Sequence, residues 1–582
     1  MRGGDLMKKF MLLFAILITL IYITSLGGEF VKIKSVNFDK SFYKIGEPVK
    51  VSVVLEGENF DEFQLKMYVM SLGSTIIEQT IKAATNLIIT FNLPNISGGY
   101  GLDVYLVDSA GHILSQSHRG FDVMSSWTQR PKYGFLTNFS NNRASPTTTM
   151  DLLAQYHING LQYYDWMYNY GQLVYPGPGT DYTDAWFRTN PISETTLENL
   201  IKTGHKYNIS SMAYVAIYAM TKNLYEEHPD WALYEFNLGK WIPVNFENKL
   251  IIAAPDNKGW SSYLIDQCKL AIKKFGFDGI HLDQYGYPKD DISATRSGTD
   301  DYHPYKTSEG FVNFINELKA AISPKVVFFN CVDDWPAKEI QSDSYEDAVY
   351  IEPWGSCNTY SQLFNMINNA RDYSNDKPII LAAYISHFFD SSIFYADSLI
   401  FADGAQRLEL GENGLVLDGP YFPADAFPMS NSFMQHLKNY YDYSVRYESL
   451  IYGEHLRGIQ TDGYISSLSD GISVSATPEV GKIFIFAKEN IKTKNIILQF
   501  INYKDLSTDL WRNWQPNPEK LINVEFQLKG EIAQKLSNYT FYFVSPDDNL
   551  KMERIDSFFE NGKIKLALPS LEYWSSIIAI PK

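Results

Sequence analysis

One stretch of the chain decides the fold: Gly276-Phe-Asp-Gly-Ile-His-Leu-Asp-Gln-Tyr-Gly286. Its centre is predicted to be a short strand. Because side chains alternate across a strand, Ile280 and Leu282 share one face, and His281 and Asp283 share the other. In a parallel barrel the apolar pair packs outward against helices. The polar pair then points inward, with Asp283 at the carboxyl end of the strand, where the active sites of such barrels lie.

A second strand carries a carboxyl group in the same position. In Ala348-Val-Tyr-Ile-Glu-Pro-Trp354 the alternation turns Tyr350 and Glu352 inward, and Pro353 ends the strand because it cannot donate to the sheet. Two carboxyl groups at one barrel mouth suit glycoside hydrolysis, which places a pair around the scissile bond. One must be ionised and the other protonated, so their environments must push their pKa values apart.

The region around these strands alternates short apolar strands with helical stretches, which predicts a (β/α)₈ TIM barrel over residues 127–454. The helix before the fourth strand is the clearest, because one buried apolar stripe is formed by Leu264, Cys268, Ala271, Ile272 and Phe275. The eight predicted strands are Tyr133–Asn138, Gly160–Asp165, Ser211–Tyr218, Gly279–Asp283, Val326–Cys331, Val349–Glu352, Ile379–Tyr384 and Arg407–Leu410.

Short strands separated by turns flank this region and make the chain multidomain. Residues 29–126 are predicted to form an N-terminal immunoglobulin-like β-sandwich, and residues 455–582 a C-terminal β-sandwich. Residues 1–28 have the pattern of a signal peptide, with Lys8 and Lys9 before an apolar run that ends near Ile23. The protein is therefore expected to be secreted, with an uncleaved N-terminal anchor as the alternative and no integral membrane partner.

Charge and cysteine content narrow the classes of partner. The formal net charge is −17, which repels phosphate backbones and argues against nucleic acid. The cysteines have no metal-ligand spacing, and the chemistry above needs no metal or organic cofactor. Cys331 and Cys357 follow predicted neighbouring strands. They either form a disulfide or remain two free thiols.

Further candidates lie at or after the ends of predicted strands. Acidic groups there could bind sugar hydroxyls, aromatic rings could stack on sugar faces, and His281 could orient Asp283 by a hydrogen bond. The rival carboxylates are Asp165 at the end of the second predicted strand, Asp333 and Asp334 after the fifth, and Glu409 on the eighth. The candidates for substrate binding are Asp165, Trp166, His281, Tyr285, Trp335, Trp354 and Glu409.

At these residues the chain resembles glycoside hydrolase family 66, the dextranases and cycloisomaltooligosaccharide glucanotransferases. The resemblance covers the barrel and the order of the domains. It implies that Asp283 is the nucleophile, that Glu352 is the general acid/base, and that the substrate is an α-1,6-linked glucan, cleaved with retention. The matching segments are Gly160-Leu-Gln-Tyr-Tyr-Asp-Trp166, residues 276–286, Ile351-Glu-Pro-Trp354 and Leu408-Glu-Leu-Gly-Glu412.

Within that family the sequence favours an endo-acting dextranase. The cyclising members carry a long carbohydrate-binding insertion late in the barrel, whereas residues 385–406 here leave room only for a helix and two loops. A cycloisomaltooligosaccharide glucanotransferase is the alternative. A non-catalytic glucan-binding surface protein is a third reading, against which the sequence argues, because such a protein needs no inward pair of carboxylates.

Overall fold

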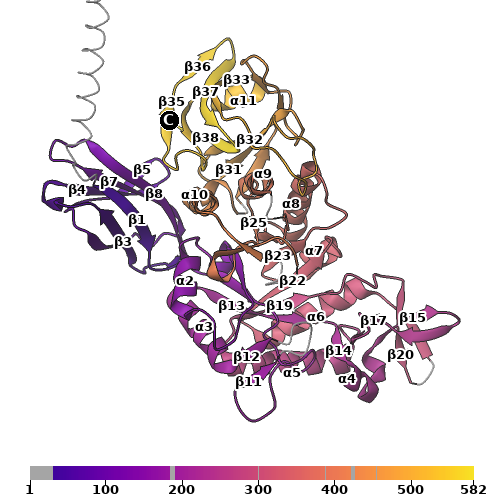
Figure 1. The fold of residues 1–582 in the computed structure, drawn as a ribbon. Helices are drawn as coiled ribbons and strands as arrows, with labels where there is room; N and C mark the ends of the chain where they lie inside the picture. Colours follow the sequence, from indigo (N-terminus) through magenta and orange to yellow (C-terminus); the bar gives the residue numbers. More distant parts are fainter. Residues whose placement is uncertain (1–30, 184–189, 299–300, 387–388, 421–425, 454) are drawn as a thin grey trace, which may run out of the picture.

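The structure is a computed structural model that describes residues 31–183, 190–298, 301–386, 389–420, 426–453 and 455–582. The expected signal peptide, residues 1–28, lies outside the described residues. A central barrel carries two groups of β-sheets, one from each end of the chain (Figure 1). Among the helices of the described ranges, none has the length and apolar character needed to cross a membrane.

The centre of the protein is a nearly closed parallel barrel. Its two edge strands meet where the backbone N–H of Phe135 donates to the carbonyl of Leu410 at 3.0 Å, next to a parallel bridge between Phe135 and Gly411. Each of the eight strands overlaps a predicted one. In spatial order they are β9 (Tyr133–Leu136), β10 (Gly160–Tyr163), β13 (Ser210–Ala216), β19 (Gly279–Asp283), β22 (Val326–Val332), β23 (Ala348–Glu352), β24 (Ile379–Leu381) and β25 (Ala405–Arg407).

Alternation along the strands separates the barrel's interior from its helical coat. On β19, Ile280 and Leu282 are fully buried in the core shared with the helices. A second cluster, which includes Tyr133, Phe328 and Tyr350, fills the interior. The α-helices described in this part of the chain are α2 (Pro146–Ala154), α3 (Glu194–Lys206), the short α4 (Lys222–Glu227), α5 (Lys258–Phe275), α6 (Thr307–Ile322), α7 (Ala337–Asp343), α8 (Tyr360–Ser374), α9 (Asp390–Ala402) and α10 (Asn431–Arg446).

The local signals read from the sequence explain where α5 begins and ends. The Asn257 side chain accepts hydrogen bonds from the backbone N–H groups of Gly259 and Trp260, which caps the first turn. The predicted stripe is buried at Leu264, Cys268, Ala271 and Phe275, and Ile272 is partly buried. Gly276 ends the helix at φ 84°, a left-handed conformation that glycine adopts without strain. The chain then enters β19, which places Asp283 at the barrel mouth.

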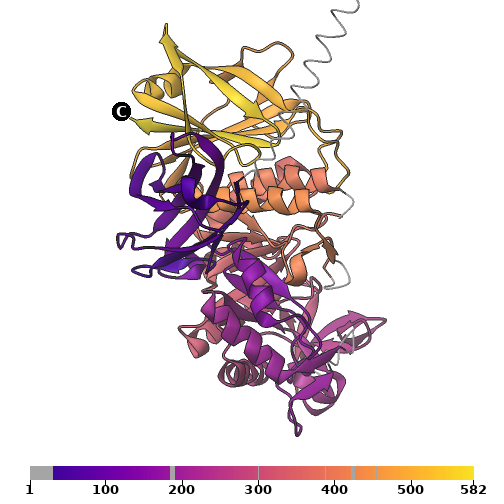
Figure 2. The same cartoon turned by 60° about the vertical axis from the view of Figure 1, so that its left-hand side comes forward.

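The N-terminal strands form two sheets that enclose a separate apolar core. They lie beside the barrel in both views (Figures 1 and 2). In spatial order the sheets are β1 (Lys32–Phe38), β3 (Val49–Glu56) and β6 (Asn86–Phe91), and β2 (Tyr43–Lys44), β8 (Ile113–Met124), β7 (Gly98–Val107), β4 (Gln64–Ser71) and β5 (Ser74–Lys82).

The C-terminal strands form two further sheets around their own core, and β32 of the larger sheet contacts α9. The larger sheet contains β28 (Leu456–Ile459), β30 (Val474–Ser475), β31 (Lys482–Asn490), β32 (Ile496–Tyr503), β38 (Trp574–Pro581), β34 (Tyr539–Val544) and β35 (Glu553–Ile555). The smaller contains β29 (Ile465–Ser467), β33 (Leu521–Leu528), β37 (Lys563–Leu571) and β36 (Ser557–Glu560), and α11 (Gly530–Leu536) follows β33.

Loops at the barrel mouth build small sheets of their own. The connections after β13 and β19 supply most of them, and these project away from the barrel (Figure 1). They are β14 (Ala219–Thr221) with β18 (Leu250–Ile252) and β17 (Asn245–Phe246), and the four-stranded sheet of β16 (Lys240–Pro243), β15 (Leu233–Asn237), β20 (Ser293–Ser297) and β21 (Asp301–Tyr305). Two hairpins complete the set, β11 (Asp181–Thr183) with β12 (Pro191–Ser193) and β26 (Leu415–Leu417) with β27 (Ala426–Pro428).

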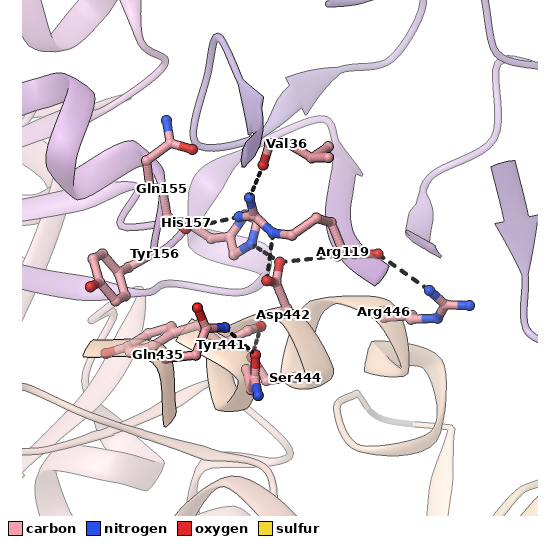
Figure 3. A network of polar contacts seen from close by, with 12 residues as sticks. Val36, Arg119, Gln155, Tyr156, His157, Gln435, Tyr441, Asp442, Ser444 and Arg446 are labelled. Atoms are coloured by element: carbon pink, nitrogen blue, oxygen red, sulfur yellow. Dashed lines mark hydrogen bonds and ion pairs between the residues drawn. The ribbon is translucent and has the colours of Figure 1, made fainter. Parts of the chain in front are cut away.

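Buried ion pairs join the N-terminal sheets to the barrel (Figure 3). The Asp442 carboxylate on α10 accepts from Arg119 Nε on β8 at 2.6 Å and from the Gly120 N–H at 3.0 Å, and its Oδ1 lies 2.9 Å from His157 Nε2. Burial by itself raises the pKa of Asp442, but the Arg119 charge and the His157 hydrogen bond hold that pKa well below its usual range. Asp442 is therefore a buried anion whose partners are buried with it.

Replacing Asp442 with Ala is expected to lower the free energy of unfolding by about 3–5 kcal/mol, because the Arg119 charge is then buried without its partner. Urea denaturation of both proteins would measure this. The matched control is Lys202→Ala, which breaks an exposed pair with Glu198 and should cost less than about 1 kcal/mol. Equal effects of the two substitutions would contradict the stabilising role of the buried pair.

Candidate functional site

A cavity of about 290 Å³ opens at the carboxyl ends of the barrel strands. Both predicted carboxyl groups line it, Asp283 as the last residue of β19 and Glu352 as the last residue of β23. Tyrosines dominate the rest of the wall, among them Tyr164, Tyr170, Tyr214, Tyr218 and Tyr384. Aromatic rings with one polar edge suit a ligand that has both apolar faces and hydroxyl groups.

A single amide group connects the two carboxyl groups. Asn330 lies on β22, between β19 and β23, and its Nδ2 donates to Asp283 Oδ1 at 2.9 Å and to Glu352 Oε2 at 2.7 Å. Because both hydrogen bonds meet at one nitrogen, these two oxygens lie no more than about 5.6 Å apart. Retaining glycosidases place their carboxyl groups about 5–5.5 Å apart, whereas inverting enzymes need about 6.5–9.5 Å.

Asp283 receives more donors than the one it shares. The Tyr214 hydroxyl donates to Asp283 Oδ2 at 2.8 Å, and the Gln284 backbone N–H donates to Oδ1 at 2.9 Å. Burial raises the pKa of Asp283, and the hydrogen bonds from Tyr214, Asn330 and Gln284 oppose that rise by stabilising the anion. These three donors suit a carboxylate that stays ionised.

The surroundings of Glu352 favour its protonated form more strongly than those of Asp283 do. Burial, followed by the nearby charge of Asp283, raises the pKa of Glu352 to about 7, against hydrogen bonds from Asn330, Trp354 and Tyr384. Two like charges so close cannot both form readily, so the proton resides on one member of the pair. The surroundings favour Glu352 as the acid and Asp283 as the anion, which is the division that two-carboxylate catalysis requires.

Neighbouring residues hold this arrangement in place. Gln284 Nε2 donates to the carbonyl oxygens of Asn330 at 3.1 Å and Trp335 at 2.6 Å, which ties the end of β19 to β22 and its loop. The indole N–H of Trp166 donates to the carbonyl of Tyr214 at 3.1 Å. Sequence reasoning missed Asn330 and Tyr214. Applying the same alternation to β13 and β22 would have found them, because each lies two residues after an inward apolar side chain.

His281 points into the barrel, as predicted, but lies deeper than Asp283. Its Nδ1 is 3.1 Å from the Tyr133 hydroxyl, its ring stacks on Tyr133, and Tyr350 packs against it edge-on. Burial lowers the pKa of His281 to about 3, so the ring is neutral. The hydroxyl that contacts Asp283 belongs to Tyr214.

The structure brings two of the predicted aromatic candidates to the cavity. Tyr285 and Trp354 line it. Trp166 is fully buried in the core shared with the helices, where its ring packs against Phe275 and Phe277. Trp335 contributes its carbonyl to Gln284, and its ring packs edge-on against Phe311, a core residue of α6.

The acidic candidates lie apart from the cavity wall. Asp165 follows β10 in a left-handed conformation and is buried. Glu409 is fully buried, with Oε2 2.9 Å from Arg407 Nη1 and Oε1 accepting from the Tyr441 hydroxyl at 3.2 Å. Asp333 caps the loop that holds Ser356 by accepting from its backbone N–H at 2.9 Å.

In the described part of the chain, the three cysteines are unpaired and no candidate metal site is formed. Cys268, Cys331 and Cys357 are buried free thiols, and burial raises the pKa of Cys268 and Cys357 to about 12. Over the described ranges, three or more His, Cys, Asp or Glu side chains do not come together in a way that could hold a metal ion.

Comparison with known proteins gives consistent matches. The model of glycosyl hydrolase family 66 matches residues 38–578. A cycloisomaltooligosaccharide glucanotransferase of Niallia circulans is 28% identical over 61% of this chain and 39% of its own length. A dextranase of Streptococcus salivarius is 22% identical over 87% of this chain and 71% of its own length. The chain thus spans about two fifths of the length of the glucanotransferase that it matches.

A solved structure shares the fold over almost the whole chain. It is a Paenibacillus sp. cycloisomaltooligosaccharide glucanotransferase complexed with cycloisomaltoheptaose. The superposition gives a TM-score of 0.83 at 21% identity and covers 94% of this chain and all of the other.

The raised pKa of Glu352 predicts the pH dependence of the site. Glu352 must be protonated to act as an acid, so kcat/KM should fall as the pH rises through about 7. Asn330→Ala removes a donor that stabilises both anions. Both pKa values then rise, and the pH–rate profile should move upward by about one pH unit.

The matched control is Gln162→Ala, which removes another neutral side chain from the cavity wall. Because Gln162 is not among the donors that stabilise the Asp283 or Glu352 anion, the profile should keep its position on the pH axis. A profile of Asn330→Ala that coincides with that of the unchanged protein would show that the amide does not set these pKa values.

Proposed function

The chain belongs to glycosyl hydrolase family 66, and we propose that it is a retaining endo-dextranase that hydrolyses α-1,6-glucosidic linkages outside the cell. The observation that carries this proposal is the shared amide of Asn330, which limits the separation of the two carboxyl groups to about 5.6 Å. At that separation one carboxylate reaches the anomeric carbon itself, with no room for an intervening water.

In the proposed mechanism Glu352 gives its proton to the glycosidic oxygen while Asp283 attacks the anomeric carbon. The bond to the leaving sugar breaks, and an ester forms between Asp283 and the glucosyl group. Glu352, now ionised, removes a proton from water, which attacks the same carbon and releases Asp283. Glu352 regains its proton, so each cycle consumes one water and returns the site to its starting state.

The surrounding donors suit each step of this sequence. Tyr214 and the Gln284 N–H stabilise Asp283 as an anion before attack and as a leaving carboxylate afterwards. Once Asp283 is esterified its charge is lost, so the pKa of Glu352 falls and the group becomes a base. The electrostatic coupling of the pair therefore supports the change of role that retention requires.

A cycloisomaltooligosaccharide glucanotransferase is the second candidate, favoured by the glucanotransferase among the relatives. Such an enzyme uses a sugar hydroxyl in place of water. One feature favours hydrolysis here. α9 occupies most of the connection between β24 and β25, where a cyclising enzyme would carry its insertion.

The proposed division of labour follows the three parts of the chain. Residues 127–454 form the catalytic barrel, residues 29–126 an immunoglobulin-like sandwich and residues 455–582 a second β-sandwich. Residues 1–28 act as a signal peptide for export. A non-catalytic glucan-binding role is the third hypothesis, and the buried pair of carboxyl groups with opposed protonation argues against it.

The expected products of dextran are linear isomalto-oligosaccharides of several lengths, resolved by chromatography, with α-1,4-glucans cleaved far more slowly. Asp283→Gly and Glu352→Gln should each lower kcat on dextran about a thousandfold or more, because each removes one of the two groups that share the chemistry. Thermal unfolding should confirm that both variants stay folded.

The matched control is Glu409→Gln, which alters a fully buried carboxyl group two residues after the end of β25, away from the cavity wall, and should retain far more of the activity per folded molecule. Near-normal turnover in Glu352→Gln would disprove its role as acid. Accumulation of cyclic sugars would favour the glucanotransferase.

A further inference from the structure

The four-stranded sheet of β16, β15, β20 and β21 belongs to the mouth of the barrel. β15 and β16 lie in the connection that follows β13, and β20 and β21 lie in the one that follows β19, the strand that ends in Asp283. Figure 1 shows β15 and β20 at the far end of this projection, with β17 between them and the barrel. The sheet is thus an outlying part of the same surface that holds the catalytic cavity.

One face of this sheet is aromatic. Phe236 pairs with Trp241 across β15 and β16, so the two side chains share a face. Their ring centroids are 5.4 Å apart, and Trp241 stacks on Tyr302 of β21 with centroids 4.9 Å apart and an interplanar angle of 12°. We call Phe236, Trp241 and Tyr302 the aromatic face.

The aromatic face is open to solvent at its outer end. Phe236 is 62% exposed, whereas Tyr234, two residues earlier on the same face, is 2% exposed. Tyr234 meets Tyr302 edge-on and carries the Arg296 guanidinium above its ring at 5.9 Å. The inner end of the sheet is therefore a packed core. Among the described residues, the ring of Phe236 at the outer end is mostly exposed, while Trp241 and Tyr302 are partly buried. Exposed apolar surface grouped in this way marks an interaction site.

A short segment of chain joins the aromatic face to the catalytic cavity. Trp241 lies in β16, and Phe246, five residues later in β17, lines the cavity. Five residues of extended chain span at most about 17 Å, the length of a few sugar rings. Phe246 packs against Tyr218, which in turn packs against Tyr285, and all three line the cavity. Aromatic side chains thus line the cavity as far as Phe246, and the segment from Trp241 to Phe246 connects this wall to the aromatic face.

We propose that the aromatic face is a distal binding subsite for the α-glucan chain whose cleavage occurs in the cavity. This inference rests on the proposed function for its ligand. The cavity of about 290 Å³ holds only a small part of a polysaccharide, so the remainder must cross the mouth of the barrel. Sugar rings offer C–H faces that stack on Trp, Tyr and Phe, and the nearby Arg296 can donate to hydroxyl groups.

The test measures binding without turnover. In a Glu352→Gln background, dissociation constants for linear dextran and for isomaltotriose are measured by calorimetry, and their ratio is compared between variants. Phe236→Ala combined with Trp241→Leu should raise the ratio of dextran to isomaltotriose about tenfold, because only the long ligand reaches the aromatic face and two stacking contacts are lost. Phe236→Ala alone removes a mostly exposed ring, so it tests the same contact with little cost in stability.

Leu238→Asn is the matched control. Leu238 is 94% exposed at the tip of the same hairpin with φ 49°, a conformation that Asn tolerates, so the substitution removes exposed apolar surface without touching a ring. Its ratio should equal that of the background protein. An unchanged ratio in the aromatic variants would overturn the proposal, and so would an equal rise of the ratio in Leu238→Asn. If the protein is a dimer that Phe236→Ala dissociates while the ratio stays constant, the aromatic face is a dimer interface and the proposal is wrong.

The two proposals fail separately. Dextran cleavage by the unchanged protein, together with an unaltered ratio in the aromatic variants, removes the distal subsite and leaves the proposed function standing. If dextran binding depends on Phe236 and Trp241 but the unchanged protein does not cleave dextran, the proposed function fails and the distal subsite stands.

Discussion

One amide nitrogen placed between two buried carboxyl groups is the constraint on which the site depends. Asn330 holds Asp283 and Glu352 within reach of a single sugar ring. Burial makes two neighbouring negative charges costly, so the pair keeps one proton. The separate donors from Tyr214 and Gln284 direct that proton away from Asp283. Distance and protonation, the two quantities that define a retaining mechanism, thus follow from the same few contacts.

The barrel maintains this constraint because each participant comes from a different parallel strand. Tyr214, Asp283, Asn330 and Glu352 lie on the consecutive strands β13, β19, β22 and β23, whose register is fixed by backbone hydrogen bonds. The interior below is filled with rings, His281 among them, so the inward side chains have little freedom to move. Outside this core, the connections after β13 and β19 form additional strands, which carry the proposed distal subsite.

The period-two pattern predicted much of this arrangement. It identified eight strands, the inward direction of Asp283 and Glu352, and their place at the barrel mouth. It could not predict contacts between strands. Trp166 follows Asp165, whose left-handed backbone turns the chain so that the indole is buried under Tyr214. Glu409 shares a face with Arg407, two residues earlier, and this face is turned toward α9 and α10, where Asp397 and Tyr441 contact the pair away from the cavity. Such partners depend on strand order and loop geometry, which periodicity does not specify.

The separation of the two carboxyl groups is tested most directly by the configuration of the first product. Proton NMR of the reducing ends, recorded within the first minutes of dextran cleavage and before mutarotation, distinguishes the two outcomes. Attack by Asp283 followed by water inverts the anomeric carbon twice, so the account predicts that the α-anomer appears first. Initial release of the β-anomer would show a single displacement by water and would contradict it.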